Sequence, residues 1–262
     1  MNKGKKKDIS KKKGSEVKTF PIPSSVEVNS EKIINYKNSN NQTIQKIINR
    51  AIEFHKEGDF LKAKENYLLL IGKGIENYKI YSNYASILKN LGELKEAKIL
   101  LEKSINLQPN YETAYSNLGN VLRDLRKLKE AETYYREAIK LKPEFAQAHS
   151  NLGNVLQDLG KLDEAKECYQ KAISINPNFV AAYSNMGNVL KDRGEVKEAQ
   201  KYYQKAIKLE PNFTDGIYNL GNLFQEIGKF EEAEKCYRKA IKLKPNLGKA
   251  YYNLSLIIEY SE

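Results

Sequence analysis

Two asparagines and an acidic residue recur together along the chain at a fixed interval. They are the side chains best suited to bind a ligand by hydrogen bonds. In residues 146–179 they are Asn151, Asn154 and Asp158. An asparagine amide carries both a donor and an acceptor, which match the C=O and N–H groups of an extended peptide. The chemistry that this pattern predicts is hydrogen bonding to a peptide backbone with little sequence preference.

The same positions return every 34 residues. The first-row asparagines are Asn83, Asn117, Asn151, Asn185, Asn219 and Asn253; the second-row asparagines are Asn120, Asn154, Asn188 and Asn222; the acidic positions are Asp124, Asp158, Asp192 and Glu226. At 100° per helical residue, both rows fall opposite the apolar stripe of His149, Leu152, Gly153 and Leu156. We therefore predict a peptide-binding groove lined by these residues.

Helix propensity adds weight to a binding role for the asparagines. In a helix interior, Asn is less favourable than Ala by about 0.5–0.7 kcal/mol, so a merely solvated face favours Lys and Glu. Replacing the first row by alanine is then expected to leave the melting temperature unchanged or to raise it. Two alternatives stay open: the amides bond to the adjacent helix, or they were copied by repeat duplication.

No arrangement of side chains in the sequence points to catalysis. The histidines and cysteines are single and scattered, so we predict no catalytic residue, no metal site and no cofactor, and a protein that is not an enzyme. Cys168 and Cys236 are 68 residues apart, at the same place in two repeats. Stacked helices put them tens of ångströms apart, beyond disulfide reach. Reduced thiols favour a cytoplasmic location.

The elements that position the asparagines follow from the repeat. Prolines mark its period, each 34 residues from the last: Pro109, Pro143, Pro177, Pro211 and Pro245. In residues 146–179, Gly160 is expected to end a first helix and Pro177 a second. The second helix would bury Ala165, Tyr169 and Ala172. We predict an all-α fold, an α-solenoid of stacked antiparallel helix pairs.

This period divides the chain into a leader and a series of repeats. The Lys-, Asn- and Ser-rich leader, residues 1–43, is predicted to be disordered. A degenerate first repeat covers 44–77, and residues 248–262 form a terminal helix, half a repeat. Five full repeats lie between them: 78–111, 112–145, 146–179, 180–213 and 214–247.

Arg126 breaks the turn pattern between the two helices of a repeat. It stands where the sister repeats have Gly92, Gly160, Gly194 and Gly228. A left-handed backbone there costs on the order of 1 kcal/mol for a residue with a Cβ. We predict a local weak point with no functional role.

Charge is concentrated at the N-terminus. Of the formal net charge of +11, residues 1–40 contribute +6. A lysine-rich leader can touch nucleic acid or an anionic surface, but it has no Arg forks and no aromatic rings interleaved with its lysine runs, so a solubilising role is favoured. The longest apolar runs are far shorter than the roughly 20 residues that span a bilayer, so no membrane span is expected.

The last stretch, residues 250–260, is more apolar than a capping helix should be. Leu254, Ile257 and Ile258 are expected to pack back on the stack, whereas Leu256 and Tyr260 are expected to stay uncovered. A homodimer through this helix is one hypothesis that follows.

The repeat resembles the tetratricopeptide repeat (TPR). One unit supplies the residues of the TPR pattern: Tyr183, Met186, Gly187, Leu190, Gly194, Ala199, Tyr203, Ala206 and Pro211. The amino-acid sequence of the repeats is most similar to the TPR superhelix of O-linked N-acetylglucosamine transferases and related bacterial multidomain proteins. That resemblance implies a concave groove whose first-row asparagines bind protein substrates.

The leading functional prediction is a scaffold that binds an extended peptide or partner protein in this groove. The alternative is the substrate-recognition arm of a glycosyltransferase-type or other transferase protein, with the catalytic domain absent from this chain. Clamping of a C-terminal carboxylate is not favoured, because it needs basic residues where the sequence has Ser116, Ser150, Asn151 and Asn185.

Overall fold

The computed structural model describes the backbone of residues 33–259 and the side chains of residues 42–258, and this part of the chain is all helical. Its helices are α1 (Ile33–Glu57), α2 (Phe60–Gly72), α3 (Tyr78–Asn90), α4 (Leu94–Leu107), α5 (Glu112–Asp124), α6 (Leu128–Leu141), α7 (Ala146–Asp158), α8 (Leu162–Ile175), α9 (Val180–Asp192), α10 (Val196–Leu209), α11 (Thr214–Glu226), α12 (Phe230–Leu243) and α13 (Gly248–Glu259). Among them, none is long and apolar enough to cross a membrane.

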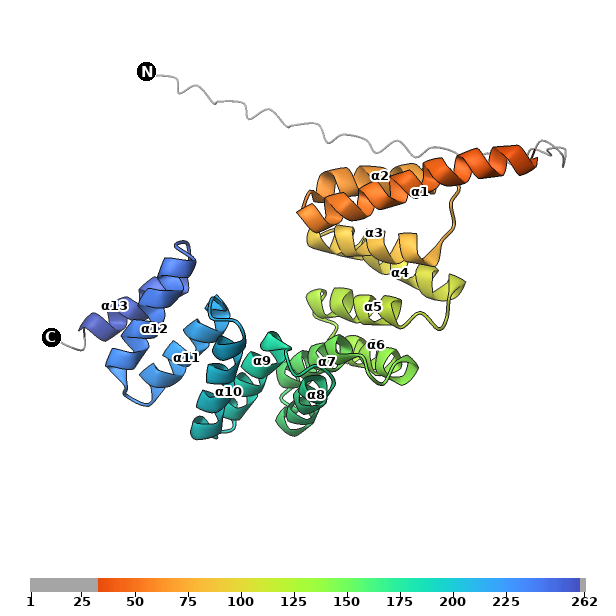
Figure 1. The fold of residues 1–262 in the computed structure, drawn as a ribbon. Helices are drawn as coiled ribbons and strands as arrows, with labels where there is room; N and C mark the ends of the chain where they lie inside the picture. The colour runs from red at the N-terminus through yellow and green to blue at the C-terminus, as the bar shows by residue number, and fades with distance from the viewer. Residues whose placement is uncertain (1–32, 260–262) are drawn as a thin grey trace, which may run out of the picture. The chain divides into compact units, whose positions relative to one another are not determined.

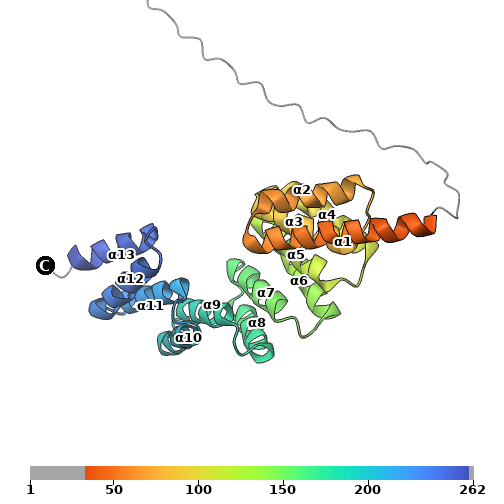
Figure 2. The ribbon, with the colours of Figure 1, turned by 45° about the horizontal axis from the view of Figure 1, so that its top comes forward.

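From α3 onward the helices form antiparallel hairpins that stack on one another (Figures 1 and 2). Each odd-numbered helix packs against the even-numbered helix that follows it, and that second helix packs against the next hairpin. The predicted α-solenoid of stacked helix pairs is confirmed. Each first helix is therefore covered on two sides.

The first helix begins earlier than the sequence predicts. Residues 33–43 belong to α1, although they were expected to be part of the leader. Between Pro23 and Gly58 the chain has neither proline nor glycine, so nothing stops the helix from extending toward the N-terminus. The remaining leader, residues 1–32, lies outside the described residues.

The turn inside each hairpin uses the predicted left-handed residue. Gly160 has φ 75°, and the N–H of Lys161 donates to the carbonyl of Leu156 at 2.8 Å, which closes the end of α7. Arg126 has φ 61° and is the one residue other than glycine with a positive φ in the described part of the chain. The left-handed backbone on which the predicted weak point depends is therefore present.

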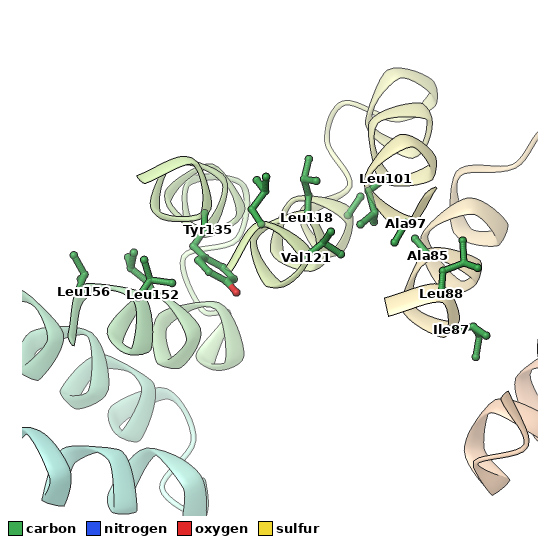
Figure 3. Packing of buried hydrophobic residues seen from close by; sticks show 14 of the residues in the cluster. Ala85, Ile87, Leu88, Ala97, Leu101, Leu118, Val121, Tyr135, Leu152 and Leu156 are labelled. Atoms are coloured by element: carbon green, nitrogen blue, oxygen red, sulfur yellow. The ribbon is translucent and has the colours of Figure 1, made fainter. Parts of the chain in front are cut away.

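In each hairpin from α5 to α12, which we call the later hairpins, a glycine of the first helix lies close to a tyrosine ring of the second helix. A Cβ added to Gly153 of α7 would lie 2.7 Å from the ring of Tyr169 on α8, so only glycine leaves room for that ring. The same pairing recurs between Gly119 and Tyr135, Gly187 and Tyr203, and Gly221 and Tyr237. These four tyrosines are fully buried in the layered core, part of which Figure 3 shows.

The terminal helix α13 is only partly covered. Leu254 and Ile257 are buried as predicted, but Ile258 is 41% exposed, so its predicted packing is wrong. Leu256, expected to be uncovered, is half-buried, and Tyr260 lies outside the described residues. The reason is that α13 meets α12 on one side, and its other side has no second helix of its own within the described residues.

Candidate functional site

The two asparagine rows lie together along the first helices of the hairpins; we call the surface that they form the asparagine face. It is less open than the helical periodicity predicts. Most of these side chains are half-buried, and Asn151 is only 8% exposed. Ser150 and Val155 on the same helix are buried too, because α7 contacts the hairpins before and after it. The rows therefore lie beside the buried surface of the helix and not opposite to it.

The second-row asparagines are hydrogen-bonded inside their own hairpin. The hydroxyl of Tyr169 on α8 donates to Oδ1 of Asn154 on α7 at 2.7 Å. Equivalent bonds of 2.7–2.8 Å join Tyr135 to Asn120, Tyr203 to Asn188 and Tyr237 to Asn222. The buried tyrosine of the core thus holds the oxygen of each second-row amide away from solvent.

From Asn117 onward, the first-row asparagines bond to the hairpin before them. Nδ2 of Asn185 donates to the same Oδ1 of Asn154 at 2.8 Å. The bond recurs from Asn151 to Asn120, from Asn219 to Asn188 and from Asn253 to Asn222, at 2.9–3.2 Å. Each second-row oxygen therefore accepts one bond from its own hairpin and one from the next hairpin.

These bonds change one expectation. Bonding to the adjacent helix was an alternative that the sequence left open, and the structure shows it for the first row. Replacing the first row by alanine removes a donor to an oxygen of the preceding hairpin at every junction from α5 onward, which costs stability. The expectation of an unchanged or higher melting temperature no longer holds.

The same bonds orient the rest of each amide. Within the described residues, Nδ2 of the second-row asparagines has no hydrogen-bond partner, and neither has Oδ1 of Asn117, Asn185, Asn219 and Asn253. Asn151 differs, because its Oδ1 accepts from Nε2 of Gln147 at 2.9 Å. Most full hairpins thus leave one amide donor and one amide acceptor without a partner among the described residues.

The acidic positions also connect neighbouring hairpins. Asp124 lies 3.6 Å from Nζ of Lys89, and Asp192 accepts from Nε2 of Gln157 at 2.8 Å. Lys191 is 3.3 Å from Asp192 and 3.8 Å from Glu226. Such solvent-accessible ion pairs contribute little to stability.

Sequence reasoning missed the tyrosine hydroxyls. Each lies 15 residues after the asparagine that it bonds, and this constant spacing was the available signal. Burial raises the pKa of Tyr237 to about 12 and those of its three sisters further, so all four stay protonated donors at neutral pH. His149, expected to pack in the core, is half-buried, and its Nε2 lies 2.9 Å from the carbonyl oxygen of Pro143.

The array of Figure 1 is similar to known repeat proteins. Sequence models of the tetratricopeptide repeat match residues 78–111, 146–179, 180–213 and 215–247, and a further TPR model matches residues 119–160. No curated protein matches the sequence.

Among solved structures, YrrB, described as a TPR protein with an unusual peptide-binding site, is 27% identical with a TM-score of 0.54, over 73% of this chain and 98% of YrrB. PilF of Pseudomonas aeruginosa is 18% identical with a TM-score of 0.68, over 82% of this chain and 98% of PilF. The matched repeats, the hairpin stack and these likenesses agree: the chain belongs to the tetratricopeptide-repeat family.

Proposed function

We propose that this protein is a scaffold that holds an extended segment of a partner protein along the asparagine face. The observation that carries the proposal is the free donor and acceptor that most full hairpins keep on this face. An extended backbone offers the complementary C=O and N–H groups. Neighbouring helices lie about 8–10 Å apart, so each repeat would meet about three residues of an extended chain.

Two further points support a peptide ligand. YrrB, a TPR protein similar to this one, is described as having a peptide-binding site. The amides are also held in place before any ligand arrives, because their other atoms are bonded to tyrosine hydroxyls and neighbouring asparagines. Preorganised groups lose little conformational entropy on binding, which favours affinity.

The test must remove the free donors without breaking the stack. Asn154→Asp together with Asn188→Asp does so, since each carboxylate still accepts from its tyrosine and from the next asparagine but offers no N–H. The control, Gln170→Glu with Gln204→Glu, makes the same charge change on exposed positions of α8 and α10 in the same two repeats.

Binding is measured with peptides selected from a displayed random library on the full chain. The double aspartate variant should bind them at least about 10-fold more weakly, because two hydrogen bonds to the peptide are lost. The control pair should bind as the unmodified protein does. Equal binding by all three proteins, or a library that yields no peptide, contradicts the proposal.

A second candidate is the recognition arm of a transferase. The first-row asparagines, which run from α3 to α13, favour it. The O-linked N-acetylglucosamine transferases, which the repeat sequence resembles, bind their protein substrates with such a row. Binding of a transferase's protein substrate by the isolated chain would support it. Loss of that binding in the double aspartate variant would place the contact on the asparagine face.

A homodimer remains a separate hypothesis for α13. Tyr251, Tyr252 and Ile258 are exposed there, with no helix of this chain over them among the residues described. Light scattering at tens of micromolar tests it, and a monomeric mass contradicts it.

A further inference from the structure

The hairpin of α3 and α4 lacks the tyrosine–asparagine pair of the later repeats. Leu101 on α4 stands where the later hairpins have the buried tyrosine, and Ser86 on α3 stands where they have the second-row asparagine. Ala85 replaces the glycine that leaves room for the tyrosine ring. Asn117, whose sisters donate to an asparagine, donates to the hydroxyl of Ser82 at 3.1 Å.

A small cavity lies at this junction, between α3, α4 and α5. Its volume is about 30 Å³, and its lining divides into two kinds of residue. Ala85, Leu101 and Val121, which are labelled in Figure 3, are buried and apolar and form one part. The other part is polar, half-buried and on the asparagine face: Ser86, Lys89, Asn117 and Asn120.

The size of the cavity limits what can enter it. A single water needs about 10–15 Å³ of such space, so there is room for about two heavy atoms and none for a leucine or an aromatic ring. The apolar part suits a methyl group. The polar part offers the Ser86 hydroxyl and the amides of Asn117 and Asn120 to a hydroxyl group.

We propose that this cavity is a side-chain subsite for a threonine or serine of the peptide bound on the asparagine face. The threonine methyl would lie against Leu101 and Val121, and its hydroxyl would bond to Ser86 and Asn117. This inference rests on the proposed function, because it needs the peptide backbone on the same face. The subsite would give the asparagine face a preference for one side chain of the peptide, whereas the rest of the face bonds only to the peptide backbone.

The test compares the full chain with a variant whose cavity is filled. Ala85→Gly with Leu101→Tyr installs the pair found in the later hairpins, and the glycine is included because a Cβ at the equivalent positions of those hairpins would lie 2.6–2.8 Å from the tyrosine ring. Peptides selected on the unmodified protein should share a threonine or serine at one position. Changing that threonine to valine should weaken binding to the unmodified protein about 5- to 10-fold, and to the filled variant hardly at all.

Two further variants keep the test decisive. Ser86→Ala removes one hydroxyl without filling the cavity and should reduce the preference for threonine over valine. Ser86→Asn introduces the residue of the later repeats and narrows the polar side, and it replaces the double variant if that protein does not fold by circular dichroism.

The outcomes separate the two proposals. If the library yields no peptide, the proposed function fails and the subsite with it. If peptides bind but show no shared threonine or serine, or bind the filled variant with the same preference, the subsite is wrong while the scaffold function stands. A shared threonine that loses its advantage in the filled variant supports the subsite.

Discussion

The hairpin of α3 and α4 and the four hairpins from α5 to α12 have helices of the same length, but they are held together differently. In the later hairpins a buried tyrosine packs on a glycine and donates to a shared asparagine oxygen. In the earlier one, Leu101 and Ala85 pack without any hydroxyl. The comparison shows that one backbone repeat can be built on a polar network or on aliphatic packing.

In a solenoid, stability is roughly a sum of repeat terms and nearest-neighbour terms. The shared oxygen adds a neighbour term at each junction between α5 and α13, because it joins two hairpins. At the junction of α3 and α5 a single bond from Asn117 to Ser82 takes its place. We therefore expect the two regions to respond differently to equivalent substitutions.

The largest contrast is expected at the close approach of glycine and tyrosine. Gly187→Ala should lower the free energy of unfolding by about 2–3 kcal/mol, because the new Cβ would lie 2.6 Å from the ring of Tyr203. Ala85→Gly, at the equivalent position of α3, should cost only about 0.5–1 kcal/mol. Urea unfolding measures both, and equal losses would contradict the contrast.

A smaller contrast is expected from removing single hydroxyl groups. Tyr169→Phe should cost about 1 kcal/mol, because Asn154 loses a bond in the core. The Tyr84 hydroxyl is buried without a hydrogen-bond partner in the described part of the chain, so Tyr84→Phe should be neutral or stabilising. The melting temperatures of the two variants measure the difference, and an equal loss in both would contradict it.

The turn of the α5–α6 hairpin offers a substitution that should stabilise. Arg126→Gly relieves a left-handed backbone and should raise the free energy of unfolding by about 0.5–1 kcal/mol. Gly160→Arg, at the same position one repeat later, should lower it by a similar amount. If both changes are neutral in denaturant unfolding, the weak point at Arg126 does not exist.

The smallest effect is expected on the outward face of α2. Leu61 is 66% exposed where α4, α6 and α10 carry Lys95, Lys129 and Lys197. Leu61→Lys should change the free energy of unfolding by less than about 0.5 kcal/mol. A larger loss in urea unfolding would reveal packing on this face that the described residues do not show.

Features that depend on neighbouring residues could be predicted from the sequence. The hairpin pattern, the glycine turns and the place of Arg126 in such a turn follow from local spacing and backbone sterics. The bonds of the asparagines could not be predicted, since Asn185 meets Asn154 across 31 residues only after hairpins have stacked. The cavity beside Leu101 also depends on three helices at once, so no single stretch encodes it.

The buried tyrosines have a consequence for alkaline solutions. An unfolded tyrosine ionises near pH 10, whereas burial raises the pKa of Tyr237 to about 12. Between these pH values the unfolded chain releases protons that the folded chain keeps, so the free energy of unfolding falls as pH rises. Below about pH 9 these tyrosines are protonated in both states and add no pH dependence to stability. The network that joins the repeats thus gives the fold an upper pH limit.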